Sequence, residues 1–399
     1  MNKPLHGVRI LDLTHMLSGP FGAMILADLG AETIKVEPLK GEGTRKLLAQ
    51  DPDHSIGGMG AYFITLNRNK KSVAVDLKSE HGRSVFYDLV RHSDVVIDNF
   101  AAGVTRRLMI DYDRLAEVNP GIVTCSVTGF GSDGPGSTRP AYDQIAQALG
   151  GGMSITGFDA DHPVRAGIPI GDLGGGMFAA IGIQSALLER ANSGRGQHVD
   201  ISMLDCQVSM LNYMATMYFL SGLNPEPIGN SHFVHVPYNT FHTADGFIVI
   251  AVVADTFWPA LKTVVEIPEF DDEKYDRQPG RWEDREMINR RLNEVLQTRG
   301  TTHWVRQLTE ARVPCAAVNR FSEALSVEQI LHRGMIVDLS HPDGSQTRGP
   351  GNPVHLSRSS EACYSAAPWL GQHTDEILRE VLKYDGDRIE QLKSVGAIA

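Results

Sequence analysis

One carboxylate stands alone in a glycine-rich stretch, at a place where it could act as a nucleophile. Residues 167–176 read GIPIGDLGGG, with Asp172 as the only charged side chain, and a largely apolar helical run over 177–188 follows. Glycines let a bulky ligand approach the main chain, and the start of a helix offers unpaired N–H groups that favour negative charge. Those are the requirements of a carboxylate nucleophile with an oxyanion site. The alternative is that Asp172 only caps the helix, a common role for aspartate.

Basic residues gather in two other places, each next to an expected strand. One is the run 67–72 (NRNKKS), and the other is the pair Arg106 and Arg107, which follows Asp98-Asn99-Phe100. Lysine and arginine at strand ends suit phosphate groups. A polyanionic, ADP-like ligand is therefore as good an interpretation of these clusters as a solvated surface.

The first 200 residues alternate between short β-branched runs and helical stretches. We expect strands at 8–13, 33–36, 71–77, 94–97, 122–128 and 198–202, and helices at 21–29, 80–92 and 174–190. Such alternation is typical of parallel βαβ units with right-handed crossovers. The predicted fold class is α/β, with a doubly wound, mostly parallel, Rossmann-like sheet that binds ligands at the carboxyl ends of its strands.

The rest of the chain predicts a second, smaller α+β domain and a return to the first. Residues 1–220 form the first part of the large domain and end in one long apolar helix over 204–220. Residues 221–230 (SGLNPEPIGN) have the composition of a linker. We expect the small domain at 231–325, with a strand at 247–253, and a return segment at 326–399 that completes the large domain with two closing helices.

Composition narrows the classes of function. The net charge of −11 argues against nucleic acid or an anionic membrane as a partner. The four cysteines form no CxxC pair, so neither a metal site nor a disulfide framework is indicated, which fits the cytoplasm. No signal peptide, no apolar run of about 18 residues, no GxGxxG, no Walker A sequence and no GxSxG motif is present. We therefore expect no resident metal or nucleotide and no membrane span.

Short motifs recur along essentially the whole chain, and their combination is specific although each alone is weak. They are Leu11-Asp12 with Gly19-Pro20, residues 28–38 (DLGAETIKVEP), residues 67–71, Asp76-Leu77-Lys78, Asp98-Asn99-Phe100, Gly129-Phe130-Gly131, Tyr142-Asp143-Gln144, Gly171-Asp172, residues 194–197 (GRGQ), Pro237-Tyr238 and residues 370–374 (LGQHT). With these motifs the chain resembles the class III CoA-transferases, the formyl-CoA and carnitine CoA-transferase family.

The resemblance implies a set of site residues. The family nucleophile falls on Asp172, and backbone donors to the oxyanion would come from Gly174 and Gly175. Contacts with coenzyme A would fall on Leu17, Ser18, Val75, Asp76, Leu77, Lys78, Asn99, Phe100, Ala101, Arg107, Pro140, Ala141, Tyr142 and Asp143. Two features of formyl-CoA transferases are missing: a phosphate-binding basic residue, replaced by Pro38, and a glycine-rich loop, near whose place residues 229–233 stand. Lys40, Arg45 or Arg139 would have to supply the charge.

The activity implied is CoA transfer from an acyl-CoA donor, succinyl-CoA first, to a short carboxylic or dicarboxylic acid through an aspartyl-CoA thioester. Residues 368–382 resemble members that act on dicarboxylates, and His232, with His235, Arg165 and Tyr238, could hold a distal carboxylate. The resemblance also implies an interlocked homodimer. Two alternatives stay open: an α-methylacyl-CoA racemase, although Tyr142 stands where its histidine would fall, and a CoA-binding protein without catalysis.

Overall fold

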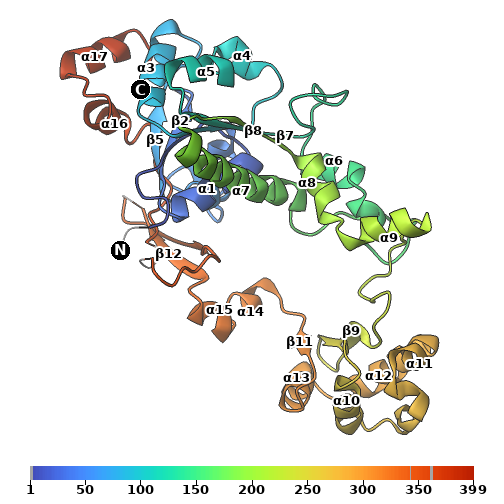
Figure 1. The fold of residues 1–399 in the computed structure, drawn as a ribbon. Coiled ribbons are helices and arrows are strands. Elements are labelled where there is room, and N and C mark those ends of the chain that lie inside the picture. Colours follow the sequence, from blue (N-terminus) through green and yellow to red (C-terminus); the bar gives the residue numbers. More distant parts are fainter. Residues whose placement is uncertain (1–2, 342, 360–362) are drawn as a thin grey trace. The chain divides into compact units, whose positions relative to one another are not determined.

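The computed structural model describes residues 3–341, 343–359 and 363–399, which form two compact units (Figure 1). The large unit takes in the chain up to Gly152, then Arg165–Gly222 and His332–Ala399. The small unit comprises Met153–Val164 and Leu223–Leu331.

The large unit is built on a six-stranded, entirely parallel sheet, as the alternating pattern predicts. Its strands run in the order β5-β2-β1-β6-β7-β8. Their bounds are β1 Arg9–Asp12, β2 Glu32–Glu37, β5 Lys70–Ala74, β6 Val95–Asp98, β7 Val123–Thr128 and β8 His198–Ser202. The strand order reverses between the neighbours β1 and β6, and a reversal of this kind is where open α/β sheets bind ligands.

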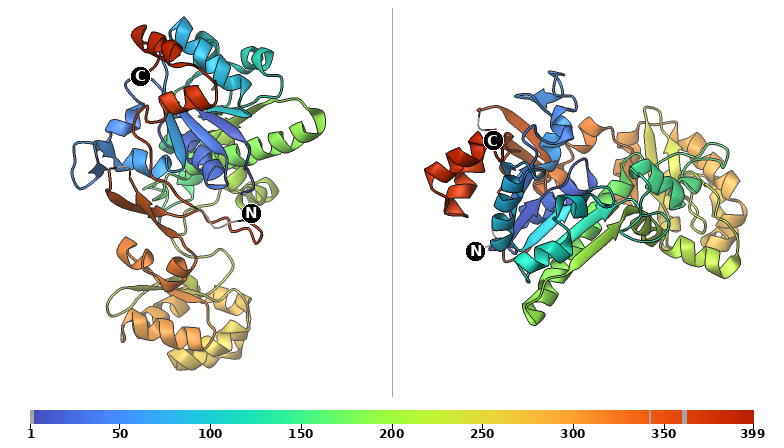
Figure 2. Two further views of the ribbon diagram at one scale, coloured as in Figure 1. Left: turned by 90° about the vertical axis from the view of Figure 1, so that its left-hand side faces the viewer. Right: turned by 90° about the horizontal axis from the view of Figure 1, so that it is seen from above.

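Helices cover both faces of the sheet, so the predicted doubly wound arrangement is confirmed. The helices α1 (Ser18–Asp28) and α7 (Ile170–Ser193) pack side by side on one face (Figure 1). The opposite face is covered by α3 (Glu80–Arg91), α5 (Tyr112–Val118), α16 (Thr374–Glu380) and α17 (Gly386–Ser394). The last two come from the C-terminal segment, which returns to the edge strand β5, where the amide of His373 donates to the carbonyl of Ser72 (Figure 2).

Glycines let α1 and α7 approach each other with almost no side chain between them. A Cβ on Gly22 would lie 2.7 Å from the carbonyl oxygen of Gly176, and a Cβ on Gly176 would lie 2.6 Å from the carbonyl oxygen of Ser18. Contacts this short exclude any larger residue at either position. Part of the glycine run around Asp172 is therefore explained by helix packing.

The predicted long helix over 204–220 is wrong in one respect, because two helices stand there. The first, α8, spans Met203–Met210, and the second, α9, spans Tyr213–Ser221. Asn212 between them has φ of 51°, which a continuous helix does not allow.

The large unit also contains three short helices and two hairpins. They are α2 Ala61–Leu66, α4 Val104–Leu108, α6 Asp143–Leu149, and the hairpins β3 Ser55–Ile56 with β4 Met59–Gly60 and β12 Ile336–Ser340 with β13 Gln346–Pro350.

The small unit has its own antiparallel sheet and its own core. Its strands run in the order β11-β10-β9, with bounds β9 Tyr238–His242, β10 Phe247–Ala251 and β11 Cys315–Ala317. The helices α10 Phe257–Val265, α11 Gln278–Glu283, α12 Arg285–Leu296 and α13 Thr301–Glu310 follow, and then α14 Phe321–Ala324 and α15 Glu328–His332 lead out. The core gathers around Trp258 and Phe270, whose ring centroids lie 5.0 Å apart.

Over the part of the chain that the structure describes, every helix is too short or too polar to cross a bilayer.

Candidate active site

Asp172 is the third residue of α7, and another residue accepts hydrogen bonds from the first amide groups of that helix. The carboxylate of Asp143 accepts hydrogen bonds from the amide groups of Gly171, at 2.8 Å, and of Asp172, at 3.3 Å. The Asp172 carboxylate itself accepts no hydrogen bond from the described residues. The interpretation of Asp172 as the N-cap is therefore wrong: Asp143 provides the carboxylate for the helix start, and the side chain of Asp172 is left for other chemistry.

The surroundings of Asp172 make it a more basic carboxylate than usual. Burial raises its pKa to about 6, and the nearby negative charge of Asp143 adds to the rise. A carboxylate with this pKa is mostly ionised at pH 7 and is a better nucleophile than an ordinary aspartate. The pKa of the nearby Tyr62 is also raised, first by burial of its hydroxyl group and second by the negative charge of Asp172.

Asp172 lies in the wall of a cavity of about 260 Å³, here called the acyl cavity. Seven of the predicted CoA contacts share this wall, namely Ser18, Asn99, Phe100, Ala101, Pro140, Ala141 and Tyr142. Arg139 is there too, with its guanidinium over the ring of Phe130. A predicted nucleophile and predicted ligand contacts from four distant segments therefore meet in one place.

A second cavity of about 470 Å³, here called the nucleotide cavity, lies beside the same loops. It contains Val75, Asp76, Leu77, Lys78, Phe100 and Arg107 from the predicted CoA contacts. Its lining is mostly apolar and includes the cationic side chains of Lys78 and Arg107, a combination that suits an adenine ring with phosphates. Of the predicted contacts, Leu17 and Asp143 line neither cavity.

The two cavities share His15 and Phe100, and His15 is a residue that the sequence reasoning missed. The rings of His15 and Phe100 lie 5.8 Å apart. Burial lowers the pKa of His15, so its imidazole is neutral at pH 7. The position of His15 in the sequence is the feature that predicts its role, because it follows Asp12 by three residues and so lies just beyond the carboxyl end of β1.

Three aspartates fix the loops that follow the strands. Oδ1 of Asp12 accepts the amide of Thr14 at 2.9 Å, Oδ1 of Asp98 accepts that of Phe100 at 3.1 Å, and Oδ1 of Asp76 accepts that of Lys78 at 3.0 Å. Each is the local turn in which an aspartate bonds the backbone two residues on. The same device therefore shapes the loops after β1, β6 and β5 that line both cavities.

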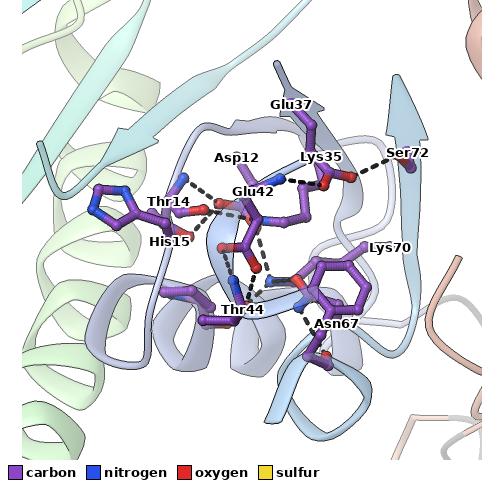
Figure 3. Close-up of polar contacts among 12 residues, drawn as sticks. Asp12, Thr14, His15, Lys35, Glu37, Glu42, Thr44, Asn67, Lys70 and Ser72 are labelled. Carbon is purple, nitrogen blue, oxygen red and sulfur yellow. Dashed lines mark hydrogen bonds and ion pairs between the residues drawn. The ribbon is translucent and has the colours of Figure 1, made fainter. Parts of the chain in front are cut away.

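A network of buried charges lies beneath these loops (Figure 3). The ammonium group of Lys70 lies 2.8 Å from Oδ2 of Asp12 and donates to Asn67 as well, and burial lowers its pKa to about 8. Lys35, also buried, donates to the carbonyl of Thr14 at 2.7 Å. The two lysines therefore fix the end of β1 and the loop after it, Lys70 through Asp12 and Lys35 through Thr14.

The network overturns one interpretation of the sequence, because the basic run 67–72 does not face a phosphate. Lys70 is buried against Asp12, Arg68 is paired with Asp28 at 2.7 Å, and Lys71 is paired with Glu376 at 2.8 Å. Of the other two predicted basic residues, Arg107 lines the nucleotide cavity, whereas Arg106 does not.

Arg45 is also excluded as a replacement for the basic residue missing at Pro38. Its guanidinium makes two bonds of 2.7 Å to the carboxylate of Glu37, and it lies over the ring of Phe63. Lys40 is exposed and Arg139 lines the acyl cavity, so these two remain as candidates.

Gly174 and Gly175 do not offer free amide groups. They are the fifth and sixth residues of α7, from where the helix ladder uses its own N–H groups. A Cβ on Gly174 would lie 2.7 Å from Cε of Met210, and one on Gly175 would lie 2.5 Å from Oγ of Ser18. Both glycines are therefore packing positions, and neither has a free amide group for an oxyanion.

His232 lies in the small unit, in a cluster of rings. Its ring stacks on Phe233 at 4.3 Å and lies 4.5 Å from that of His235, and its Nδ1 accepts the amide of Val234 at 3.0 Å. Its part in binding an acid stays a prediction. Among the described residues no three histidine, cysteine, aspartate or glutamate side chains are arranged to hold a metal ion.

Comparison with known proteins assigns this chain and its fold to one family of enzymes. The family model described as CoA-transferase family III matches residues 5–374. The chain therefore belongs to CoA-transferase family III, as its motifs predict.

Individual relatives agree with that assignment. The human succinyl-CoA:glutarate CoA-transferase is 35% identical over 398 residues, covering 99% of this chain and 90% of the relative. The succinyl-CoA:mesaconate CoA-transferase of Haloarcula hispanica is 35% identical, covering 94% and 96%. Among solved structures, a CAIB/BAIF family protein from Brucella suis superposes with a TM-score of 0.87 at 34% identity, over 96% of this chain and 100% of that one.

Proposed function

We propose that this protein moves CoA from an acyl-CoA donor, with succinyl-CoA as the first candidate, to a short dicarboxylic acid. The observation that carries the proposal is Asp172: a half-buried carboxylate with a raised pKa and no hydrogen bond from the described residues, in a cavity that adjoins a second one fit for a nucleotide. The names of the relatives support the choice of substrates, since they are transferases of succinyl-CoA with glutarate or mesaconate.

The reaction proceeds by acyl exchange on Asp172. Its carboxylate oxygen attacks the thioester carbon of the donor, and CoA leaves as the thiolate, which gives a mixed anhydride. The thiolate then attacks the aspartyl carbonyl and releases the donor acid, which leaves CoA on Asp172 as a thioester. The acceptor carboxylate then attacks the aspartyl thioester and displaces the thiolate, which gives a second mixed anhydride. The thiolate attacks the acceptor's carbonyl carbon in that anhydride, which forms the new acyl-CoA and frees the carboxylate of Asp172. Every bond broken is replaced by another, so neither water nor ATP takes part.

The neighbouring residues position the two ends of CoA. We assign the nucleotide to the cavity of Lys78 and Arg107, and the thioester to the cavity of Asp172. The pantetheine arm then passes His15 and Phe100, which border both cavities. A neutral imidazole offers one donor and one acceptor, which suits the amides of that arm.

The test is a transfer assay with trapping of the intermediate. Wild type with succinyl-CoA and a panel of glutarate, mesaconate, oxalate and monocarboxylates should form new acyl-CoA species, read by mass spectrometry. Donor alone should leave protein carrying CoA less one water, on Asp172. Asp172→Ala should lose both signals, while Asp133→Asn, at an exposed position, should keep them. Normal turnover by Asp172→Ala would refute the nucleophile.

A racemase is a distinct outcome of the same assay. No acyl exchange with any acid, together with deuterium uptake by a chiral 2-methylacyl-CoA in deuterated water, would replace the transferase proposal. CoA binding with neither reaction would indicate a protein that only binds CoA.

We propose as well that the protein is a homodimer. The helix α9 presents Phe219 and Leu220 to solvent, 80% and 83% exposed, which a single chain gains nothing by exposing. Light scattering on the purified protein should give twice the mass of one chain, and a monomeric mass would contradict this proposal.

A further inference from the structure

Ser18 carries a hydroxyl group that the fold itself leaves without a partner. The residue is 4% exposed, and its Oγ makes no hydrogen bond with any of the residues that the structure describes. Burying an unsatisfied hydroxyl costs about 1–3 kcal/mol, so native structures seldom keep one without a use. Ser18 also lines the acyl cavity together with Asp172.

The hydroxyl lies over the face of α7 that carries the nucleophile. A Cβ on Gly175 would stand 2.5 Å from Ser18 Oγ, so this oxygen occupies the space that a side chain would need. Asp172 and Gly175 are three residues apart on one helix and are therefore neighbours on its surface. Ser18 Oγ thus packs against α7 at Gly175, about one helical turn along the chain from Asp172.

The backbone around Ser18 also favours negative charge. Ser18 is the first residue of α1, whose first turn holds no acidic residue and whose N-cap, Leu17, provides no side-chain hydrogen bond. The free N–H groups of a helix start carry a partial positive charge. An anion that forms beside Ser18 would meet both this charge and the unpartnered hydroxyl.

We propose that Ser18 is a catalytic residue, whose hydroxyl donates a hydrogen bond to the oxyanion formed in the acyl cavity. The proposal rests on the transferase function. When the carboxylate or thiolate adds to a carbonyl carbon, the π pair moves onto the carbonyl oxygen, and Ser18 stabilises that charge without giving up its proton. The pair returns as the leaving group departs. Ser18 thereby fills the role that Gly174 and Gly175, inside the helix, do not.

The test separates this role from a structural one, because the two predict opposite changes in stability. Ser18→Ala should lower kcat about 100-fold, the usual loss for one oxyanion donor. The KM for succinyl-CoA and the Kd for CoA should change less than about threefold, since the bond forms only in the transition state. The melting temperature should stay the same or rise, since an unsatisfied hydroxyl has been removed from the interior.

The matched control is Ser93→Ala, at a buried serine that lines neither cavity. Its hydroxyl already donates to the carbonyl of Leu89 at 2.8 Å, so kcat should change less than about threefold. Ser18→Gly repeats the test with no methyl group in the cavity wall, in case Ser18→Ala folds poorly.

An unchanged kcat in a folded Ser18→Ala or Ser18→Gly protein would overturn the proposal, and so would a fall in kcat matched by a fall in melting temperature. If wild type transfers CoA, Asp172→Ala does not, and Ser18→Ala is normal, only the role of Ser18 fails. If wild type transfers nothing, the transferase function fails and the role of Ser18 with it.

Discussion

The side-chain amide of Asn99 makes two hydrogen bonds to the backbone of His15, one to its amide group and one to its carbonyl group. Its Oδ1 accepts the amide of His15 at 2.9 Å, and its Nδ2 donates to the carbonyl of His15 at 2.6 Å. Asn99 stands just beyond the end of β6 and His15 just beyond the end of β1, so this pair ties together the two loops at the point where the strand order reverses.

Asn99→Ala should therefore weaken CoA binding although its main contact is with the protein. Two hydrogen bonds to the backbone are lost, which costs about 1–3 kcal/mol of unfolding free energy and lets the His15 loop move. We expect the Kd for CoA by titration calorimetry to rise about tenfold, and the urea midpoint to fall. Asn192→Ala, at an exposed site late in α7, is the control. An unchanged Kd would show that the loop holds its position without this clamp.

The rate of transfer should fall as the pH drops below about 6. Asp172 has a pKa raised to about 6, so acid protonates it and removes the nucleophile. A plot of log kcat/KM against pH should bend near that value, because this parameter reports the free enzyme.

Asp143→Asn should move this bend to lower pH, because it removes the second cause of the raised pKa and keeps an oxygen for the helix start. Burial, the first cause, remains, so the bend should stay above 3.8, the ordinary value. A flat profile between pH 5 and 7 in the wild type would contradict the assignment.

Asp172→Asn should make the protein more stable at neutral pH while abolishing transfer. The folded-state pKa of Asp172 lies above its unfolded value, so between about pH 4 and 6 the folded state binds the proton more tightly. Stability from this group is present at low pH and is lost as pH rises through the folded pKa. Removing the charge should gain about 1–2 kcal/mol at pH 7 by urea unfolding, with less gain at pH 4. Lower stability at pH 7 would refute the argument.

Lys70→Met should destabilise the protein by about 3–5 kcal/mol, because it removes the nearer of the two lysines that pair with the buried carboxylate of Asp12. The double variant Asp12→Asn with Lys70→Met removes both charges and should recover part of the loss. Unfolding in urea measures both effects, with Lys46→Met, at an exposed site, as the control. A loss below about 1 kcal/mol in the single variant would mean that Lys35 compensates.

The sequence predicts the parallel sheet well because the sheet depends on a local pattern, whereas the role of Asp172 as nucleophile stays a proposal. Strands and helices alternate at regular spacing, and Asp172 stands among glycines in the first turn of the long helix α7. The basic run was misread because residue type alone does not say which way a strand side chain points: Lys70 and Ser72 lie on one face of β5 and point into the protein. The oxyanion role of the glycines failed for a similar reason, since their packing partners, Ser18 and Met210, are distant in sequence.

The contact between Gly22 and Gly176 has a consequence for how this enzyme can change. Asp172 and Ser18 stand at the starts of the two helices that meet there, main chain against main chain. Their separation is therefore set by the backbone and cannot be adjusted by exchanging one core side chain for another. New acids would have to be accommodated by residues outside this helix pair, so directed evolution of substrate range should leave α1 and α7 untouched.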